Sequence, residues 1–558
     1  MWSSDWLPKA VITEDLAELV RRAQEATFPN EELPSPRFER PRHRDHGDWS
    51  TNAALAAAKG RGAPREIAER IKAKLPASDL IEKVEVAGPG FLNFYLSPAW
   101  LHQVVRSAAE PATRFGKKPS GASGRKINVE YVSCNPTGPV NVVSGRHAAV
   151  GDAVSNLLEA AGHDVTREFY INDAGRQIDL FAESIAARYL QHWGQAASVP
   201  DDGYQGDYMK DIAAAIAAEV GDRYLSVDPT TRNQAMKVAG LAQMLREMRT
   251  TLSRFGTEFD VWFSEQSLHD AGKIEDAIAK IEAAGHLQER DGAKWFLSSN
   301  FGDDKDRVVV RSNGEPTYLG SDLPYLQDKF GRGFDHLIYL WGADHHGTIS
   351  RLLAGAEALG LDRSAVEVRL VQIVSLLSGG EAVKASKRAG AIVPLDELID
   401  DVGADAARYI FLSRSYDGPL EFDLALAKEQ APENPVYYVQ YAHARICSIL
   451  RKAAAEGVDF DMDTAELARL VHPAEDALMR KLASYEEVIP EAAEARAPQR
   501  VARYIEELAS DFSSFYRDCK VIGEDPELTG ARLALSAATK GVIASALGLL
   551  GVGAPESM

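Results

Sequence analysis

Hydrophobic and polar positions in the first part of the chain follow helical and strand periods in turn. Apolar residues repeat at helical spacing over 12–26 and 51–75, whereas 83–96 alternates as a strand does around a Gly-Pro-Gly turn. This pattern predicts a small α+β unit over residues 1–115. The segment 116–126 is rich in Gly, Ser and Lys and marks a domain junction.

A strand–turn–helix–strand order begins at Ile127 and predicts an α/β domain with a doubly wound, Rossmann-like parallel sheet. From about 180 to 295 the pattern is mostly helical, which predicts a helical insertion between two halves of a nucleotide-binding fold. Apolar runs predict the strands of the second half at 306–312, 336–344 and 366–377. We expect this domain to cover residues 120–400.

Helical periodicity dominates after about residue 400. Apolar stripes at helical spacing occupy 436–455, 465–485, 498–519 and 528–550. The pattern predicts an all-α C-terminal domain over 434–558, joined to the α/β domain by a linking segment over 401–433.

Composition excludes several classes of protein. The 558 residues are enough for about three or four domains. The three cysteines, Cys134, Cys447 and Cys519, are too few for a disulfide framework and indicate a reducing compartment. The N-terminus lacks a signal-peptide pattern, and the apolar stretch 541–554 is shorter than the ~18 residues of a membrane span. We therefore expect a cytoplasmic protein with no membrane partner.

Charge alone argues against a nucleic-acid partner. The chain has 62 Lys and Arg against 82 Asp and Glu, a net charge of −20, whereas phosphate contact favours a basic surface. Only the binding face has to be basic, however, and basic clusters lie within 36–44 and 116–126. For such clusters, a phosphate-binding face and a solvated loop are equal alternatives.

Two segments carry residues suited to phosphate binding. A Gly/Pro-rich turn within 129–152 follows a strand and precedes a helix, so its backbone N–H groups would face a phosphate at the sheet edge. A purely structural turn is an equal alternative. A loop with Lys384, Ser386, Lys387 and Arg388 could bind a polyphosphate, and the alternative is a solvated basic loop.

A third segment, LWGADHHGTISRLL (340–353), lies between an apolar strand and a helix. Asp344, at the end of the strand, can bind a pair of ribose hydroxyls. His345 and His346 are possible metal ligands, but no carboxylate or cysteine has a suitable spacing from them. We therefore predict no metal site.

In this order and separation, the segments resemble a class I aminoacyl-tRNA synthetase and, more narrowly, an arginyl-tRNA synthetase. The resemblance covers essentially the whole chain. In the α/β domain it rests on EYVSCNPTGP, FYINDAGRQI, DKDRVVVRSNGEPTYLGSDLPYLQDKF, IYLWGADHHG and KASKRAG. AGPGFLNFYL (87–96) is similar to the end of the family's N-terminal tRNA-binding domain. Two late segments resemble the family's helical anticodon-binding domain: NPVYYVQYAHARICSIL (434–450) and RLALSAATKGVIASALGLLGVGAPESM (532–558).

The resemblance implies a pocket for arginine. Glu130, Tyr318 and Asp322 would hold the side chain, and Asn135 would hold the α-amino group. A planar guanidinium with five donors favours carboxylates in bidentate geometry together with a phenol acceptor. Tyr318 and Asp322 are four residues apart and share a face if their segment is helical.

It also implies sites for ATP and tRNA. Gly342 and Asp344 would bind the ATP ribose, and His345 would line the same pocket on the arginine side. The phosphates would be bound by Lys384, Ser386 and Lys387, where positioning and electrostatics supply most of the catalysis. tRNA contacts are expected from Arg40, Arg42, Arg44, Phe91 and Asn93.

The chain departs from the family at its HIGH-type signature. The expected His, Gly and His are replaced by Asn141, Val143 and Ser144, and the Met of the KMSKS-type loop is replaced by Ala385. Asn and Ser can still donate neutral hydrogen bonds, and Arg146 retains positive charge near the helix start. The predicted catalytic residues are therefore Asn141, Ser144, Lys384 and Lys387.

The implied reaction is ATP-dependent activation of L-arginine and its transfer to tRNA(Arg), which releases AMP and pyrophosphate. Mg²⁺ is inferred from the polyphosphate substrate, no tightly bound cofactor is expected, and the protein is expected to be a monomer. Two alternatives stay open. One is a catalytically impaired tRNA-binding paralogue with a regulatory role. The other is a ligase that passes arginine to a different acceptor, although a small acceptor would not require two tRNA-facing domains.

Overall fold

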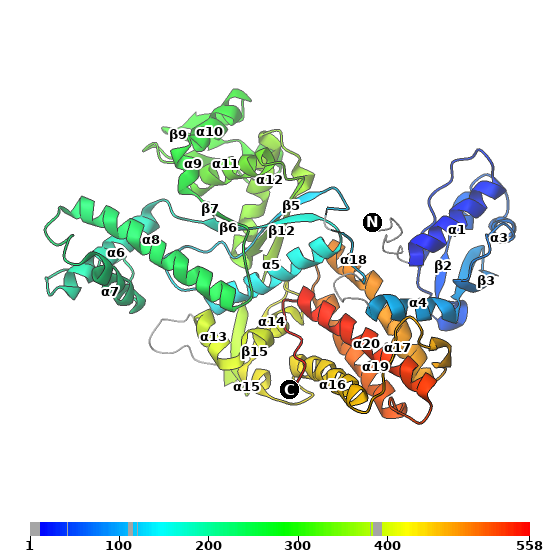
Figure 1. The fold of residues 1–558 in the computed structure, drawn as a ribbon. Coiled ribbons are helices and arrows are strands. Elements are labelled where there is room, and N and C mark those ends of the chain that lie inside the picture. Colours follow the sequence, from blue (N-terminus) through cyan, green and yellow to red (C-terminus); the bar gives the residue numbers. More distant parts are fainter. Residues whose placement is uncertain (1–11, 42, 110–114, 120, 380, 383–392) are drawn as a thin grey trace, which may run out of the picture.

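The computed structural model describes the whole chain except residues 1–11, 42, 110–114, 120, 380 and 383–392. An N-terminal unit, a central α/β region with a projecting helical arm, and a C-terminal helical bundle follow one another along the chain (Figure 1). Within the described ranges, no helix combines the length and the hydropathy that a membrane span needs.

The N-terminal unit is an antiparallel sheet with strand order β1-β2-β4-β3, flanked by helices. Its strands are β1 (Phe38–Glu39), β2 (Trp49–Thr51), β3 (Ile81–Ala87) and β4 (Phe91–Leu96). Its helices are α1 (Ile12–Thr27), α2 (Ala53–Ala57), α3 (Pro64–Lys72) and α4 (Pro98–Ala109). The stretch 51–75 holds two helices where one was expected, because Gly60 and Gly62 adopt positive φ angles that interrupt helical geometry.

The predicted doubly wound parallel sheet is confirmed. It has five strands in the order β12-β11-β5-β6-β7, and every neighbouring pair is parallel. The strands are β5 (Lys126–Glu130), β6 (Asp164–Ile171), β7 (Val261–Ser264), β11 (His336–Gly342) and β12 (Val366–Val371). The helices closest to the predicted site are α5 (Val142–Ala160), α11 (Tyr318–Gly331) and α12 (Ile349–Ala358).

The helical insertion consists of α6 (Arg176–His192), α7 (Tyr208–Val220) and α8 (Pro229–Arg254), which form the projecting arm and share their own hydrophobic core (Figure 1). The expectation that it extends to residue 295 is wrong, because β7 already returns to the edge of the main sheet. Helices α9 (Gln266–Asp270) and α10 (Lys273–Ala283) follow.

Two predicted strands of the main sheet belong to smaller sheets. Segment 306–312 contains β10 (Arg307–Val310), which pairs with β9 (Ala293–Phe296) and β8 (Leu287–Arg290) in an antiparallel sheet. The run 366–377 divides into β12 and β13 (Val374–Ser378), and β13 pairs with β14 (Glu381–Ala382) and β15 (Leu420–Asp423). Periodicity identified these segments as strands, but it does not specify the partner of a strand.

The predicted linking segment is folded: α14 (Ala404–Leu412), β15 and α15 (Leu424–Lys428) follow α13 (Leu395–Val402). The all-α C-terminal domain is confirmed. Its helices are α16 (Pro435–Ala455), α17 (Pro473–Ala483), α18 (Tyr485–Ala495), α19 (Gln499–Asp518) and α20 (Pro526–Leu549). The helix expected from 465 begins at Pro473, which is pre-organised for the first helical position, and α18 was not expected.

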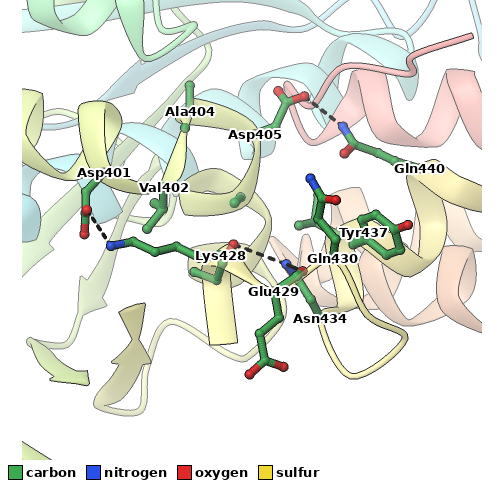
Figure 2. Close-up of a pocket in the computed structure, with 14 residues that line it drawn as sticks. Asp401, Val402, Ala404, Asp405, Lys428, Glu429, Gln430, Asn434, Tyr437 and Gln440 are labelled. Carbon is green, nitrogen blue, oxygen red and sulfur yellow. Dashed lines mark hydrogen bonds and ion pairs between the residues drawn. The ribbon is translucent and has the colours of Figure 1, made fainter. Parts of the chain in front are cut away.

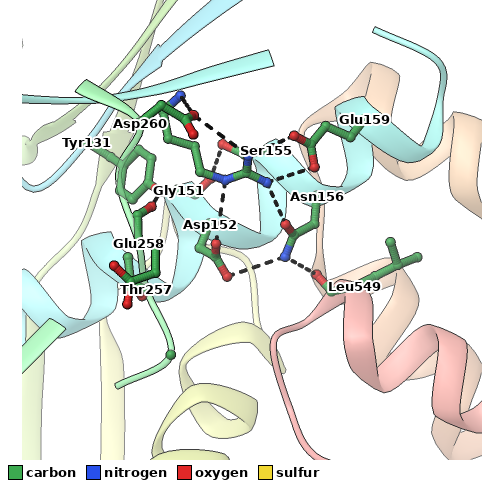
Figure 3. A network of polar contacts seen from close by, with 12 residues as sticks. Tyr131, Gly151, Asp152, Ser155, Asn156, Glu159, Thr257, Glu258, Asp260 and Leu549 are labelled. Atoms are coloured by element: carbon green, nitrogen blue, oxygen red, sulfur yellow. Dashed lines mark hydrogen bonds and ion pairs between the residues drawn. The ribbon is translucent and has the colours of Figure 1, made fainter. Parts of the chain in front are cut away.

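Polar contacts join α5, β6 and the end of α20 (Figure 3). Arg167 on β6 donates to both oxygens of Glu159, at 2.7 and 2.8 Å, and to Oδ1 of Asn156 at 2.8 Å. The Asn156 amide donates in turn to Asp152 and to the carbonyl of Leu549, both at 3.3 Å. The helix that begins at the signature is thereby bonded to the C-terminal domain.

Arg408 of α14 makes a second connection at the same place. Its side chain is fully buried, pairs with Asp152, and donates to the carbonyl of Leu550 at 3.1 Å. The same guanidinium donates at 3.0 Å to the carbonyls of Phe255 and Gly256 after α8. One cation thus binds segments from the catalytic and C-terminal regions together.

Candidate active site

The turn between β5 and α5 brings the signature to the carboxyl edge of the sheet. Val132 and Ser133 have φ angles of 68° and 38°, a strained conformation for a β-branched valine. Ser133 Oγ accepts the N–H of Tyr170 on the neighbouring strand at 3.1 Å and helps to hold the turn. Asn141 then caps α5, because its Oδ1 accepts the N–H of Ser144 at 2.9 Å.

The segment that leaves the predicted lysine loop is bonded to this turn. The N–H of Val142 donates to the carbonyl of Val393 at 3.0 Å, and the N–H of Leu395 donates to the carbonyl of Val140 at 2.8 Å. The predicted phosphate ligands of the loop lie outside the described residues: Lys384, Ser386 and Lys387. The residues that follow the loop, from Val393 to Leu395, are nevertheless hydrogen-bonded to the signature through the backbone.

Asn141 and Ser144 lie at the helix start, as predicted. Capping occupies Oδ1 of Asn141, and its Nδ2 has no hydrogen-bond partner among the described side chains and backbone. The hydroxyl of Ser144 contacts the Cys134 thiol, whose pKa burial raises to about 12. The Asn141 amide therefore remains able to donate to a ligand.

Arg146 cannot supply charge to phosphates, and that expectation is wrong. Its side chain is fully buried. The guanidinium donates to the carbonyls of Gln372 and Gly418 at 2.9 Å and to that of Ser415 at 3.1 Å. It fixes α5 against the small sheet that contains β13.

The predicted ribose-binding residues lie at the carboxyl end of β11, beside β5. A Cβ on Gly342 would come within 2.5 Å of Asp344 Oδ1, so a larger residue at this position would displace the Asp344 side chain. The Asp344 and His345 side chains are 82% and 57% exposed, and His345 Nε2 lies 3.7 Å from Asp344 Oδ2. Both are accessible to a nucleotide.

His147 was not among the predicted site residues. It lies three residues beyond Ser144 on α5, and its ring is 3.9 Å from where a Cβ on Gly342 would be. Burial lowers its imidazole pKa to about 4, and a hydrogen bond with the Leu340 carbonyl opposes this shift. The ring is therefore neutral near pH 7. Its position was predictable, because residues three apart share a helix face.

The charges of four carboxylates act on the hydroxyl of Tyr170 on β6. Burial raises the pKa of Tyr170, and the charges of Glu265, Asp322, Glu130 and Asp173 raise it further. These acids come from β5, from the end of β6, from the start of α9 and from α11. A cluster of negative charge in a partly buried space favours a cationic ligand.

Asp322 is the unpaired member of this cluster. It forms no hydrogen bond or ion pair with any residue that the structure describes. Burial raises its pKa to about 7; Arg351 opposes the shift, and Glu265 and Glu130 add to it. Tyr318 begins the same helix, four residues earlier, as expected, although its side chain is not described.

Glu130 and Asn135 already have protein partners. Glu130 Oε2 lies 2.5 Å from Nζ of the fully buried Lys329, so Glu130 does not offer both oxygens to a substrate. The exposed Asn135 accepts from Asn172 at 2.8 Å and donates to Gln177 at 2.6 Å. Lys329 was missed, although it lies seven residues after Asp322 and hence two turns along the same helix face.

A separate pocket of about 560 Å³ lies where α13 and α14 meet α16 (Figure 2). Its polar side chains pair with one another: Gln440 donates to Asp405 at 2.8 Å, and Lys428 to Asp401 at 2.5 Å. None of the predicted site residues lines it. In the described part of the chain, no group of three or more His, Cys, Asp or Glu side chains could hold a metal ion.

Arg40 connects two domains. Its guanidinium donates to both oxygens of Glu487 on α18, at 2.9 and 2.5 Å, and lies 4.6 Å from the ring centre of Trp49. The pair joins the N-terminal unit to the helical bundle, so Arg40 is not a free phosphate ligand.

Asn93 does not present its side chain to tRNA, contrary to expectation. It is 5% exposed on the inner strand β4, and its Oδ1 accepts the Ser50 hydroxyl at 2.8 Å. Phe91 is half-buried at the start of this strand. Arg42 lies outside the described residues, and the side chain of Arg44 is also not described.

Comparison with known proteins agrees with this architecture. Residues 9–96 match the arginyl tRNA synthetase N terminal domain, 112–413 match the catalytic domain of tRNA synthetases class I (R), and 439–558 match the DALR anticodon binding domain. The arginine–tRNA ligase of Moorella thermoacetica is 47% identical over 552 residues, 98% of each chain. That of Citrifermentans bemidjiense is 47% identical over 96% of this chain and 97% of its own.

A solved structure shares the fold. The Thermus thermophilus arginyl-tRNA synthetase superposes with a TM-score of 0.74 at 23% identity, covering 98% of this chain and 100% of its own. The three matched domains and the full-length identity together lead to one conclusion. The chain belongs to the arginyl-tRNA synthetase family of class I aminoacyl-tRNA synthetases.

Proposed function

We propose that the chain activates L-arginine with ATP and transfers it to the terminal ribose of tRNA(Arg). The arginine carboxylate attacks the α-phosphorus of ATP, and pyrophosphate leaves. A hydroxyl of the tRNA ribose then attacks the carbonyl of arginyl-adenylate, and AMP leaves. ATP enters as a substrate together with Mg²⁺, which neutralises polyphosphate charge.

The unpaired Asp322 carries the assignment of arginine. Among the described residues this carboxylate has no ion-pair partner, although the charge of Arg351 acts on it. A guanidinium would supply that partner in a partly buried space where a charge pair is strong. Glu265, Glu130 and Asp173 would increase the attraction. A neutral amino acid would leave this cluster uncompensated, which is costly.

The altered signature retains the means to bind ATP. The Asn141 amide and the N-terminus of α5 supply donors, and backbone bonds of Val393 and Leu395 hold that segment beside the turn before α5. Gly342, Asp344 and the neutral His147 would form the nucleoside side of the site.

One assay tests the function directly. Purified protein, ATP, Mg²⁺ and labelled arginine should charge bulk tRNA, and omission of ATP should abolish charging. Asp322→Asn should weaken charging by raising the arginine KM, whereas Asp201→Asn on the exposed surface of the insertion should leave charging unchanged. Binding of tRNA without formation of arginyl-adenylate, with every substrate present, would instead establish a silent paralogue.

Two further properties complete the proposal. Charging of tRNA for translation implies a cytoplasmic enzyme. One polypeptide holds both the site and the matched anticodon-binding domain, so we infer a monomer. Sedimentation of the enzyme at working concentration, alone and with tRNA, tests the monomer; a stable dimer with higher specific activity would contradict it.

A further inference from the structure

Lys329 is a fully buried cation that no step of the proposed reaction uses. Its ammonium lies 2.5 Å from Glu130 Oε2 and 3.9 Å from Glu168 Oε1. It also lies 4.0 Å from the ring centre of Tyr339 and 4.4 Å from that of Tyr325. Two aromatic faces and two carboxylates therefore enclose it on the inner side of α11.

Glu168 does not depend on Lys329 for its charge balance. Arg332 donates to both of its oxygens, at 2.6 and 2.9 Å, and the Tyr325 hydroxyl donates at 2.5 Å. The Asn128 amide adds a bond at 3.2 Å. The direct hydrogen bond of Lys329 is to Glu130.

Glu130, in contrast, depends on Lys329. It is 4% exposed, and Lys329 is its only hydrogen-bonding or ion-pairing partner among the described residues. A buried carboxylate without a partner either takes up a proton or turns toward another donor. Lys329 holds Oε2 on one side, so the orientation of the carboxylate is fixed and Oε1 is left without a protein donor.

We propose that Lys329 is a positioning residue for amino-acid recognition. Its ammonium holds Oε2 of Glu130 and thereby directs Oε1 toward the substrate guanidinium, while Asp322 supplies the charge pair. The guanidinium would thus neutralise Asp322, whereas Glu130 is already paired with Lys329 and would only accept a hydrogen bond from it. This inference rests on the proposed function, since it concerns the same arginine pocket.

Four proteins test it in a double-mutant cycle: the wild type, Lys329→Met, Glu130→Gln, and the double variant. Arginine and ATP KM are measured by charging, and arginine binding by calorimetry. Lys329→Met should raise the arginine KM by about 10- to 150-fold, the range for a hydrogen bond to a charged group, with the ATP KM unchanged. Lys305→Met is the matched control, because Lys305 is exposed and its ammonium has no hydrogen-bond or ion-pair partner in the described part of the chain.

The double variant separates positioning from folding. Removal of both charges relieves the buried carboxylate, so thermal stability should recover relative to Lys329→Met. Arginine KM should stay high, and Lys329→Met should change it by less than about threefold in the Glu130→Gln background. If Lys329→Met does not fold, Glu130→Gln and the double variant still allow this comparison.

Two outcomes overturn the inference. Recovery of arginine KM together with stability in the double variant would show that Lys329 serves the fold alone. Additive effects of the two substitutions on arginine KM would show that Lys329 does not act through Glu130. A wild-type protein that neither binds nor charges arginine would instead refute the proposed function, so the two failures are distinguishable.

Discussion

Arginine binding should weaken as the pH falls through neutrality. Burial raises the pKa of Asp322 to about 7, and a guanidinium pairs with the carboxylate but not with the acid. Asp322 is about nine-tenths ionised one pH unit above this value and about one-tenth ionised one unit below it. The arginine KM should therefore rise about tenfold between pH 8 and pH 6, measured by tRNA charging in a constant-ionic-strength buffer.

Substitution of Asp322 identifies the titrating group. Asp322→Asn removes one partner of the charge pair and should raise the arginine KM by about two to four decades, equivalent to about 3–5 kcal/mol. The remaining pH dependence between pH 6 and pH 8 should be small. Glu265→Gln is the control. Because the pKa of Glu265 is raised only to about 6, this variant should retain most of the change in arginine KM near pH 7.

Stability should change in the opposite direction. The folded protein holds the Asp322 proton more tightly than the unfolded chain does, so ionisation of Asp322 destabilises the fold as the pH rises from about 4 to 7. Without arginine, Asp322→Asn should unfold at a higher temperature than the wild type at pH 8, and the difference should vanish near pH 4. An arginine KM that is constant from pH 6 to pH 8 in the wild type would refute the assignment of Asp322.

Three other predictions concern the signature, the tRNA contacts and the domain junction. Lys387→Ala should slow adenylate formation by about two to three decades, whereas Asn141→Ala should cost less, because a neutral amide stabilises phosphate charge less than an ammonium. Joint Arg42→Glu and Arg44→Glu substitutions should weaken tRNA binding and reduce its log–log salt slope by about two. Gly551→Ala should lower the free energy of unfolding by at least about 1–3 kcal/mol, because φ is 65° and a Cβ would meet a buried guanidinium.

Matched controls accompany these variants. Asn141→His with Ser144→His should increase adenylation little, since Val143 still occupies the glycine position; a large gain would show an ordinary site weakened by the two losses. Unchanged tRNA affinity after charge reversal would make 42–44 a solvated loop. Gly548→Ala, where a Cβ meets nothing within 4 Å, should leave stability intact, and an equal loss there would contradict the steric argument for Gly551.

Local pattern was sufficient to predict whole elements but not their partners. The long helices α16, α19 and α20 were predicted within a few residues, because their apolar stripes repeat over five or more turns. Strands β10 and β13 were recognised as strands yet assigned to the wrong sheet. Pairing depends on contacts between residues distant in sequence, and a period of two residues carries no information about them.

Site residues divide in the same way. The strand–turn–helix pattern placed Asn141 and Gly342 at the carboxyl edge of the sheet, because each follows the end of a parallel strand, β5 or β11. Asp322 on α11 was expected from the resemblance alone. Arg146 lies on the side of α5 that faces the segment before β13. The spacing of residues along the chain does not predict this packing. Nothing in the sequence around Lys329 distinguishes it from a surface lysine. Its burial is explained by the carboxylates of Glu130 on β5 and Glu168 on β6, which are distant in sequence.

The contacts of Arg408 determine when this part of the protein can finish folding during synthesis. Its guanidinium pairs with Asp152 on α5 and donates to the carbonyl of Leu550. More than 380 residues separate Asp152 from Leu550 in the sequence, so Leu550 is synthesised much later. During synthesis, domains generally fold from the N-terminus onward. Here, however, the α/β region supplies Asp152 and the carbonyls of Phe255 and Gly256, but the Nε–H of Arg408 gains its acceptor only when Leu550 has left the ribosome. A nascent chain stalled before that point should be open at Arg408 and sensitive to proteolysis, and release should close it.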